Sequence, residues 1–296
     1  MELLAGIEAG GTKFVCAVGS SPWEIKARCR IPTTTPGETI DRAIAFFRST
    51  SGSGDRLRAL GIGSFGPLDL DPDSPTFGTM TTPPKAGWAD VDLIHPFRQS
   101  LDVPVALDTD VNVAAFGEWR HGAARDLDMV LYLTVGTGIG GGGVIHGQRM
   151  RGLSHPEMGH IRIPHDEDRD PFPGCCPYHL DCLEGLASGP AIEQRWHASA
   201  EVLADDHPAW SLEAHYLALG ISTFICVISP QRVIVGGGVM RRSALLGKIR
   251  QEVGGPLGGY LQHPSLLGDL DTYIVPPGLG EDSGIVGALA LAQATT

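Results

Sequence analysis

Hydrophobic residues along this chain come in short runs, and glycine-containing turns separate the most regular of them. Residues 3–7 and 12–18 form two such runs, and the residues between them include Glu8-Ala9-Gly10-Gly11. Strand-like runs joined by a glycine turn are typical of a β-hairpin. The pattern recurs where residues 129–135 and 139–145 flank Gly136-Thr137-Gly138. Two similar units in one chain predict two lobes of related topology.

The other apolar positions predict helices that alternate with strands. Apolar residues three or four apart mark one set of segments, and short continuous apolar runs mark another. The expected helices are residues 36–49, 111–121, 190–197, 211–229, 240–253 and 282–293, and the further expected strands are 59–63, 103–107, 232–235 and 272–275. Residues 149–184 are rich in His, Cys, Pro and acidic residues and show little periodicity.

These elements predict an α/β protein with two lobes, and 296 residues with 42% apolar side chains are enough to build both. We place the lobe boundary near residues 115–125. The N-terminal lobe is expected to cover residues 1–118 and to be completed by the C-terminal helix within 282–296. The C-terminal lobe is expected to cover residues 119–281.

Composition narrows the classes of function. A formal charge of −12 argues against binding to nucleic acid, and Arg241-Arg242 is the densest basic pair. We find no signal peptide after Met1, and no window that reaches the roughly 18 apolar residues of a membrane span. Six unevenly spaced cysteines do not resemble a secreted disulfide framework. We therefore expect a cytoplasmic protein that binds neither nucleic acid nor membrane.

Three glycine clusters follow apolar runs, where a backbone turn can approach an anion closely. Gly10-Gly11-Thr12-Lys13 adds a hydroxyl and a cation to such a turn, but alone it is as well explained as a structural hairpin turn. Gly136-Thr137-Gly138 begins a longer glycine-rich stretch, and Gly236-Gly237-Gly238 precedes an expected helix. Each cluster is compatible with a simple tight turn, but three of them at strand ends favour a nucleotide-binding cleft.

Asp110 stands at the end of an expected strand and ahead of an expected helix, within Asp108-Thr109-Asp110-Val111-Asn112. An acidic residue there can act as a helix N-cap. A carboxylate at a strand end beside a phosphate site can instead be the general base that accepts a proton from an attacking hydroxyl. This segment alone does not separate the two interpretations.

The segment 155–184 carries a metal-site pattern. Cys176, His179 and Cys182 have Cys-x2-His-x2-Cys spacing, and His160 supplies a fourth ligand for tetrahedral zinc. Four protein ligands leave no open position, so the zinc would be structural. Cys175 is an alternative to Cys176, and the competing interpretation is that these residues are surface histidines and buried free cysteines.

Taken together, the motifs resemble the ROK family of sugar kinases and repressors, and within it the bacterial zinc-containing fructokinases. The resemblance rests on several motifs in order along nearly the whole chain. They are residues 6–13, 61–67, 108–112, 136–140, 157–160, 182–185 and 234–238.

The resemblance implies a two-lobed actin-like ATPase (ribonuclease H-like) fold with ATP and sugar in a central cleft. It assigns the ATP phosphates to the turns at residues 10–13 and 136–138, and the adenosine side to residues 236–238. It makes Asp110 the catalytic base. In the mechanism that we expect, Glu8 is a candidate to hold magnesium through water. The candidate sugar residues are Gly66, Pro67, Asn112, Glu157 and His160, with Thr82, Lys85 and Trp88 from the Pro-rich loop at residues 81–88.

Departures from the glucose-specific pattern point to a substrate. Thr109 stands where many glucose-type members have Asn, and Pro177 and His179 break their cysteine motif. Both changes resemble the fructokinase branch, as does the Pro-rich loop at residues 81–88. That loop is expected either to wall the sugar pocket, with Trp88 against the ring, or to be a plain surface loop.

The sequence thus predicts an ATP- and Mg²⁺-dependent hexose kinase, with fructose the leading substrate and a homodimer the expected assembly. Glucokinase, mannokinase and N-acetylhexosamine kinase are the alternatives within the family. The alternative from another class is a sugar-responsive repressor or non-catalytic sensor. A repressor needs a helix-turn-helix, and the first expected strand begins already at Leu3.

Overall fold

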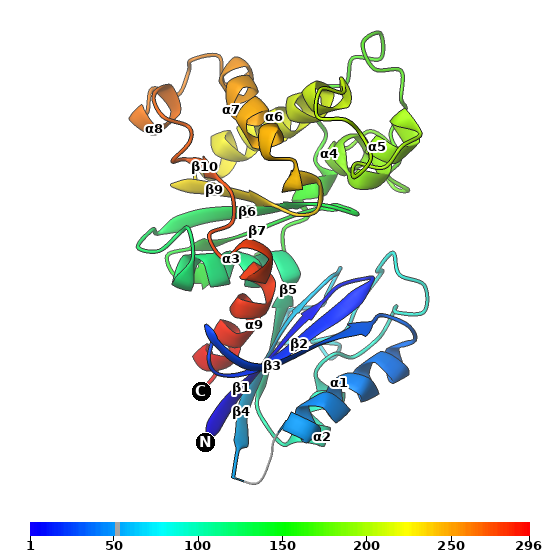
Figure 1. The fold of residues 1–296 in the computed structure, drawn as a ribbon, viewed down its shortest axis with the longest axis vertical. Helices are drawn as coiled ribbons and strands as arrows, with labels where there is room; N and C mark the ends of the chain where they lie inside the picture. Colours follow the sequence, from blue (N-terminus) through cyan, green and yellow to red (C-terminus); the bar gives the residue numbers. More distant parts are fainter. Residues whose placement is uncertain (51–53) are drawn as a thin grey trace. The chain divides into compact units, whose positions relative to one another are not determined.

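The structure, a computed structural model, describes residues 1–50 and 54–296. The chain forms two compact units (Figure 1). The first unit contains Met1–Arg125, Gln148–Pro156 and Glu281–Thr296, and the second contains Asp126–Gly147 and Glu157–Gly280. The first unit therefore includes a short internal segment, Gln148–Pro156, that both follows and precedes parts of the second unit in the sequence.

The first unit is built on a five-stranded mixed sheet in the order β3-β2-β1-β4-β5. β1 pairs antiparallel with β2, as the hairpin pattern predicts, and parallel with β4, which pairs parallel with β5. The strands are β1 (Glu2–Ala9), β2 (Lys13–Ser21), β3 (Glu24–Pro32), β4 (Arg56–Ser64) and β5 (Val105–Thr109).

Helices cover both faces of this sheet (Figure 1). α1 (Pro36–Thr50) and α2 (His95–Leu101) lie on one face, where Ile44 and Phe97 share a core with Phe14 of β2. α9 (Ser283–Ala294) lies on the opposite face, where Ile285 and Leu289 pack on alternate strand residues, and α3 (Asp110–His121) packs beside it. A Cβ atom at Gly61 of β4 would collide with the carbonyl of Ala288, so glycine lets α9 lie directly on the sheet.

The second unit repeats the strand–glycine turn–strand pattern. β6 (Met129–Val135) pairs antiparallel with β7 (Ile139–Ile145) and parallel with β9 (Arg232–Gly236), and β10 (Ile274–Val275) pairs with β9. The strand order within this unit is β10-β9-β6-β7. The two-residue strand β8 (Gln148–Arg149) comes next in the sequence and is the start of the internal segment of the first unit. The predicted α/β class and the second hairpin are thus confirmed.

Five α-helices are described in the second unit: α4 (Leu183–Ala187), α5 (Gly189–Trp196), α6 (Ala209–Ile228), α7 (Ser243–Leu257) and α8 (Pro264–Leu267). Three short 3₁₀ turns accompany the helices of the chain: η1 (Met158–His160), η2 (Val239–Arg241) and η3 (Gly280–Asp282). α7 begins later than predicted because η2 occupies the residues that follow the glycine cluster after β9. The short elements α2, α8 and β8 carry too little periodicity to be recognised in the sequence.

α6 corrects the expectation that no part of the chain is apolar enough to span a membrane. This 20-residue helix reaches a mean hydropathy of 1.5 over its most apolar window, although 56% of that window is buried inside the protein. It packs against α4 and α7. A helix that is more than half buried against two other helices is also what the core helix of a soluble protein shows.

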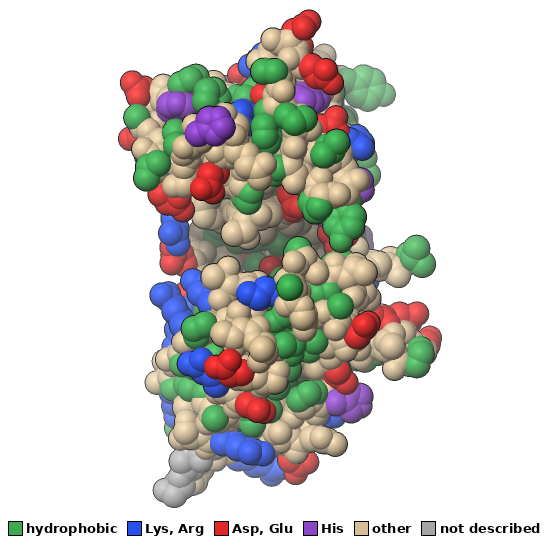
Figure 2. Space-filling model, turned by 90° about the vertical axis from the view of Figure 1, so that its right-hand side faces the viewer, with side chains coloured by type: hydrophobic (Ala, Val, Ile, Leu, Met, Phe, Trp, Pro, Cys, Tyr) green, Lys and Arg blue, Asp and Glu red, His purple; other side chains and the backbone are tan. Residues whose placement is uncertain are grey.

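Basic side chains are also more concentrated on the surface than the pair Arg241-Arg242 alone would indicate. Lys26, Arg28 and Arg30 are the exposed alternate residues of the edge strand β3, and Figure 2 shows Lys and Arg side chains gathered along one side of the first unit. Arg28 is paired with Asp282 at 2.6 Å. Charged side chains on an edge strand oppose edge-to-edge pairing with other chains, which explains this group without a nucleic acid.

A buried polar cluster lies beside α6 in the second unit. The Asp170 carboxylate, 3% exposed, accepts hydrogen bonds from Arg195 Nε (3.1 Å) and from the Tyr216 hydroxyl (2.6 Å). Glu213, on the same helix as Tyr216, is 2% exposed. Neither of its carboxylate oxygens has a hydrogen-bond partner among the described residues, and burial raises its pKa well above the usual value.

We predict that Glu213→Met will increase the free energy of unfolding near neutral pH by about 1–3 kcal/mol, the usual cost of an unsatisfied buried polar group. Because the pKa is raised by folding, the folded state holds this proton to higher pH than the unfolded chain does. Stability is therefore lost as pH rises above the ordinary value of 4.5. The gain should shrink as pH falls toward that value in denaturant titrations.

The matched control is Glu193→Met, because Glu193 lies exposed on α5. Its effect should stay within about 0.5 kcal/mol. A Glu213→Met protein that is less stable than the wild type near neutral pH would contradict the prediction.

Candidate active site and metal centre

The turn between β1 and β2 is exposed at its tip and anchored at its base. Thr33, which follows β3, donates its hydroxyl to Gly10 O (2.7 Å) and its N–H to Thr12 O (2.9 Å). Gly10 N–H closes the turn onto Lys13 O at 2.9 Å. Gly11 has open space where a Cβ would stand, and Thr12 and Lys13 are exposed. The turn can therefore present backbone, a hydroxyl and an ammonium group to an anion.

Glu8 lies near the end of β1 with its carboxyl group against the start of α9. A Cβ atom at Gly284 would lie 2.6 Å from Glu8 Cδ, so only glycine fits there. Burial raises the pKa of Glu8, and the nearby charges of Arg28 and Lys13 oppose that rise. The helix N-terminus also favours the anion. Glu8 is thus a largely buried acid behind the first glycine turn.

The carboxyl ends of the parallel strands β1, β4 and β5 lie at one edge of the first sheet. Phe65, just after β4, donates its N–H to Ala9 O at 2.9 Å. Gly66 and Pro67 follow, joined by a cis peptide bond, and the next N–H, that of Leu68, donates to His155 Nε2 at 3.0 Å. The residues predicted from these separate motifs therefore share one edge, as ligand-binding residues do in open α/β sheets.

Asp110 is the first residue of α3, and Thr109 is the N-cap. Thr109 Oγ1 accepts from Asn112 N–H at 3.3 Å, which is the bond that an N-cap side chain makes. The N-cap interpretation of Asp110 is therefore wrong. Asp110 is half-buried, and its Oδ1 accepts from Val111 N–H at 2.9 Å.

Asn112 and Trp88 are placed differently from what the resemblance implied. Asn112 is fully buried, and its Nδ2 donates to Asp108 Oδ1 and Met150 O, each at 2.9 Å. Trp88 has no exposed surface, and its indole N–H donates to Thr34 O at 2.9 Å. Its ring stacks at an angle against Phe14 and Phe65.

The expectation that Trp88 packs against a sugar ring is therefore corrected: its ring is part of the core beneath the loop. Thr82 is exposed and Lys85 is half-buried on that loop. These two residues, rather than the tryptophan, are accessible to a ligand.

In the second unit, the turn after β6 and the turn after β9 lie side by side. Gly237 has φ +100°, and a Cβ there would collide with Val135 at the end of β6. At Gly138 a Cβ would lie 2.6 Å from Glu184 Oε2, so a larger residue would displace that side chain. Gly136 O accepts from the N–H of Gly189, the first residue of α5, at 2.7 Å. Backbone from three segments therefore converges at the ends of two parallel strands.

Glu184 belongs to the sequence motif at residues 182–185, and the structure shows that it supports the glycine turn. Its Oε2 accepts from Ile139 N–H at 2.8 Å, directly after Gly138. It thereby holds the glycine turn from the side of α4. Gly236 and Gly238 complete the neighbouring turn, and Thr137 is exposed at the tip of the first.

The four predicted zinc ligands come together. Their ligand atoms all lie within 4.8 Å of one another. Cys176 Sγ is 3.6 Å from His160 Nδ1 and 3.7 Å from His179 Nδ1, and Cys182 Sγ is 3.7 Å from His160 Nδ1. When tetrahedral zinc binds sulfur at about 2.3 Å and nitrogen at about 2.1 Å, the sulfur and nitrogen atoms lie about 3.6 Å apart. The donor set fits zinc in type, number and spacing.

Local backbone explains how a four-residue pattern folds into this cluster. Cys176 and Leu180 exchange backbone hydrogen bonds, which turns the chain back so that Cys176 and His179 face the same point. Burial raises the pKa of Cys182 to about 11, so a bound cation would be needed to hold it as a thiolate. Cys175 instead lies 4.0 Å from the Ser188 hydroxyl, outside the cluster.

Glu157 precedes His160 at the entrance of η1 and is exposed. Its backbone O accepts from His160 N–H at 3.1 Å. The predicted sugar residue and the predicted metal ligand are therefore fixed to each other by a single turn of 3₁₀ helix.

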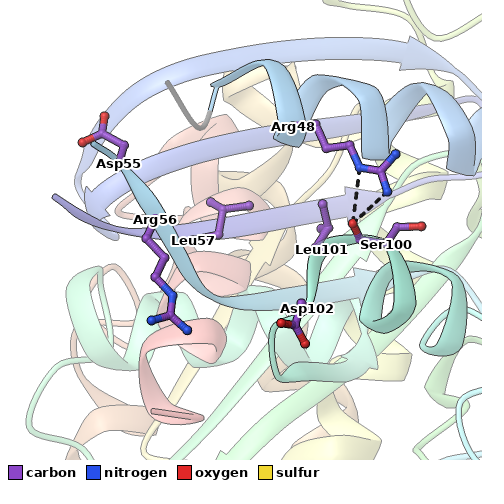
Figure 3. Close-up of a pocket in the computed structure, with 7 residues that line it drawn as sticks. All are labelled: Arg48, Asp55, Arg56, Leu57, Ser100, Leu101 and Asp102. Atoms are coloured by element: carbon purple, nitrogen blue, oxygen red, sulfur yellow. Dashed lines mark hydrogen bonds between the residues drawn. The ribbon is translucent and has the colours of Figure 1, made fainter. Parts of the chain in front are cut away.

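A separate pocket of about 300 Å³ opens at the other end of the first sheet (Figure 3). It lies beside Arg56 at the start of β4 and Asp102 after α2, and Arg48 donates to Ser100 O (Figure 3). These are the amino ends of the strands, away from the edge that carries Asp110 and the glycine turn. The pocket therefore has no part in the candidate active site.

Comparisons with known proteins show which family this chain resembles along its length. The sequence profile of the ROK family matches residues 4–295. A fructokinase of Zymomonas mobilis subsp. mobilis is 44% identical over 97% of this chain and 95% of its own length. A fructokinase of Pediococcus pentosaceus is 41% identical over 99% of this chain and 98% of its own length.

Among solved structures, a ROK family glucokinase from Streptomyces griseus, in complex with glucose and AMPPNP, superposes with a TM-score of 0.79. It is 27% identical, and the match covers 99% of each chain. The predicted actin-like α/β fold is thereby confirmed. With a profile match along nearly its whole length, this chain belongs to the ROK family.

Proposed function

We propose that this protein is an ATP-dependent fructokinase, which transfers the γ-phosphate of ATP to the 6-hydroxyl of fructose. The observation that carries the proposal is the likeness, 44% and 41% identical over nearly the whole chain, to two fructokinases. Thr109 and His179, the departures from the glucose-specific pattern, support fructose over glucose.

ATP is bound chiefly by backbone in this proposal. In the first unit, the turn at residues 10–13 supplies N–H groups, the Thr12 hydroxyl and the Lys13 ammonium to the phosphates. In the second unit, the turn at residues 136–138 contacts phosphate oxygens and the turn at residues 236–238 contacts the adenosine side. Magnesium would neutralise phosphate charge, and Glu8 would hold it through water.

Asp110 is the proposed general base. The fructose O6 attacks the γ-phosphorus, the bond from that phosphorus to the β,γ-bridging oxygen breaks, and ADP leaves with its electron pair. The proton of the 6-hydroxyl passes to the Asp110 carboxylate. Asp110 lies in the first turn of α3, and the partial positive charge of a helix N-terminus is favourable to a carboxylate.

In the first unit, the residues that we propose as sugar contacts follow β4 and lie on the loop at residues 81–88. In the second unit, they lie at the two ends of η1. The proposed contacts are Gly66, Pro67, Thr82 and Lys85 in the first unit, and Glu157 and His160 in the second. The side chains of Asn112 and Trp88 are buried, so they would support these residues from inside the first unit instead of contacting the sugar. The expected homodimer and the cytoplasmic location stay predictions.

Zinc would be held by His160, Cys176, His179 and Cys182. With four protein ligands it supplies no reactive position, and its effect is to fix a segment that has little regular structure. Since His160 is also a sugar residue here, the metal would position one wall of the substrate site.

The proposed substrate is tested by measuring ADP release, with Mg²⁺ present, for fructose, mannose, glucose and N-acetylmannosamine at equal concentration. We expect the highest kcat/KM with fructose. A higher value with another hexose would keep the kinase and refute the fructokinase assignment. Turnover with none of them would favour a sugar sensor.

Replacing Asp110 with Asn should lower kcat by about 10²-fold or more, because the amide cannot accept the proton. Circular dichroism and the melting temperature should stay as in the wild type. Asp41→Asn is the matched control, since Asp41 is an exposed acid on α1. Turnover in the Asp110 variant close to that of the control would refute the assignment.

Elemental analysis of the purified protein should find about one zinc per chain. Cys176→Ser should abolish it and lower the melting temperature by roughly 5–10 °C. The matched variant Cys226→Ser, at an exposed cysteine, should change neither value. Full zinc content in the Cys176 variant would exclude this ligand set.

A further inference from the structure

A buried carboxylate lies two residues before the proposed base. Asp108 has no exposed surface, yet both of its oxygens are hydrogen-bonded. Oδ1 accepts from Thr109 N–H and from Asn112 Nδ2, each at 2.9 Å. Oδ2 accepts from Arg149 Nε at 2.6 Å and from Arg151 Nη2 at 2.9 Å.

The two bonds to Asp108 Oδ1 involve residues on either side of Asp110 in the sequence. Asp108 holds the N–H of Thr109, the Thr109 hydroxyl accepts the N–H of Asn112, and the Asn112 amide returns to Asp108. These three bonds link Asp108, Thr109 and Asn112 into one closed hydrogen-bond network, and Asp110 lies within that stretch of the sequence. The chain on both sides of the base is therefore fixed by three hydrogen bonds among Asp108, Thr109 and Asn112.

The second pair of bonds comes from the internal segment Gln148–Pro156, which we call the strap. Arg151 also donates to Leu107 O (3.1 Å), and the strap residue Met150 accepts from the Asn112 amide (2.9 Å). Arg149 lies over the Phe116 ring of α3, 5.4 Å from its centre. The strap is therefore bound to β5 and to α3.

His155 secures the far end of the strap. Its Nε2 accepts from Leu68 N–H at 3.0 Å, directly after the Gly66–Pro67 peptide. The strap thus connects the strand ends of β4 and β5, both of which carry candidate sugar residues. Glu157, another candidate sugar residue, is the next residue in the sequence.

The buried charge of Asp108 depends on all of these partners. A carboxylate that is removed from water is stable only if paired and fully hydrogen-bonded, and loss of one partner leaves the charge uncompensated. Arg151 contacts Asp108 Oδ2 through Nε (3.2 Å) as well as Nη2, a forked contact that lysine cannot reproduce. The strap arginines are therefore matched in shape and charge to Asp108.

We propose that Asp108, Arg149 and Arg151 are positioning residues for phosphoryl transfer: the strap arginines hold Asp108, and Asp108 fixes the backbone on both sides of Asp110. This inference rests on the proposed role of Asp110 as the general base. It assigns function to two arginines that no sequence motif indicated.

The test compares Arg151→Lys and Arg149→Lys with Arg58→Lys. Arg58 is an exposed residue of the same unit that pairs with Glu2 at 3.1 Å, so it controls for loss of an ordinary ion pair. Each strap variant should lower kcat about tenfold to a hundredfold, as small displacements of catalytic groups do. The KM for ATP should change by less than about twofold, since the nucleotide residues are not touched. Arg58→Lys should leave both unchanged.

Hydrogen–deuterium exchange provides a measurement that is independent of activity. In the strap variants, peptides covering residues 105–116 should exchange faster than in the wild type, together with those covering 148–157. Peptides covering β1 and β2 should be unchanged. The two variants disturb Asp108 separately, so the test survives if one of them fails to fold.

An unchanged kcat in a folded strap variant would overturn the inference, as would a loss of protection throughout the first unit, because that result indicates a purely structural ion pair. If the wild type shows no turnover with any hexose, the proposed function fails instead. In that case the exchange of residues 105–116 still decides whether the strap fixes this segment.

Discussion

Parallel pairing of β1, β4 and β5 puts three strand ends at the same edge of the first sheet, and the other candidate residues of that unit depend on this arrangement. The glycine turn follows β1, the Gly66–Pro67 segment follows β4, and Asp110 follows β5. α9 holds the arrangement from one face, where glycines allow close packing. A shift of one strand by a residue would turn its side chains to the opposite face and separate these groups.

The second unit uses the same principle with fewer side chains. Its candidate nucleotide residues are almost all glycines, placed where β6 and β9 end beside the start of α5. Phosphate can be bound by backbone N–H groups only if side chains leave room, so the requirement is for absent Cβ atoms. The Glu184 carboxylate accepts from Ile139 N–H and helps to hold the first of these turns in place.

The irregular segment follows a different rule. Residues between His160 and Cys182 form little regular structure, and four inward-facing ligand atoms substitute for a hydrophobic core. Here two buried cysteines and two half-buried histidines lie at distances that a bound cation would stabilise. The strap shows the converse case, in which a buried carboxylate is compensated by protein groups alone.

The sequence by itself determined the elements whose partners are near in the chain: the two hairpins, most long helices, the glycine turns and the spacing of the metal ligands. It did not determine β3, although its residues alternate, or the burial of Trp88 and Asn112. It gave no sign of the ion pairs between Asp108 and the strap, which join residues about 40 positions apart. Periodicity records how a side chain relates to its own helix or strand. Which distant group it meets is decided only when the sheet and its connections are packed, and for that reason tertiary structure alone showed how Asp110 is held.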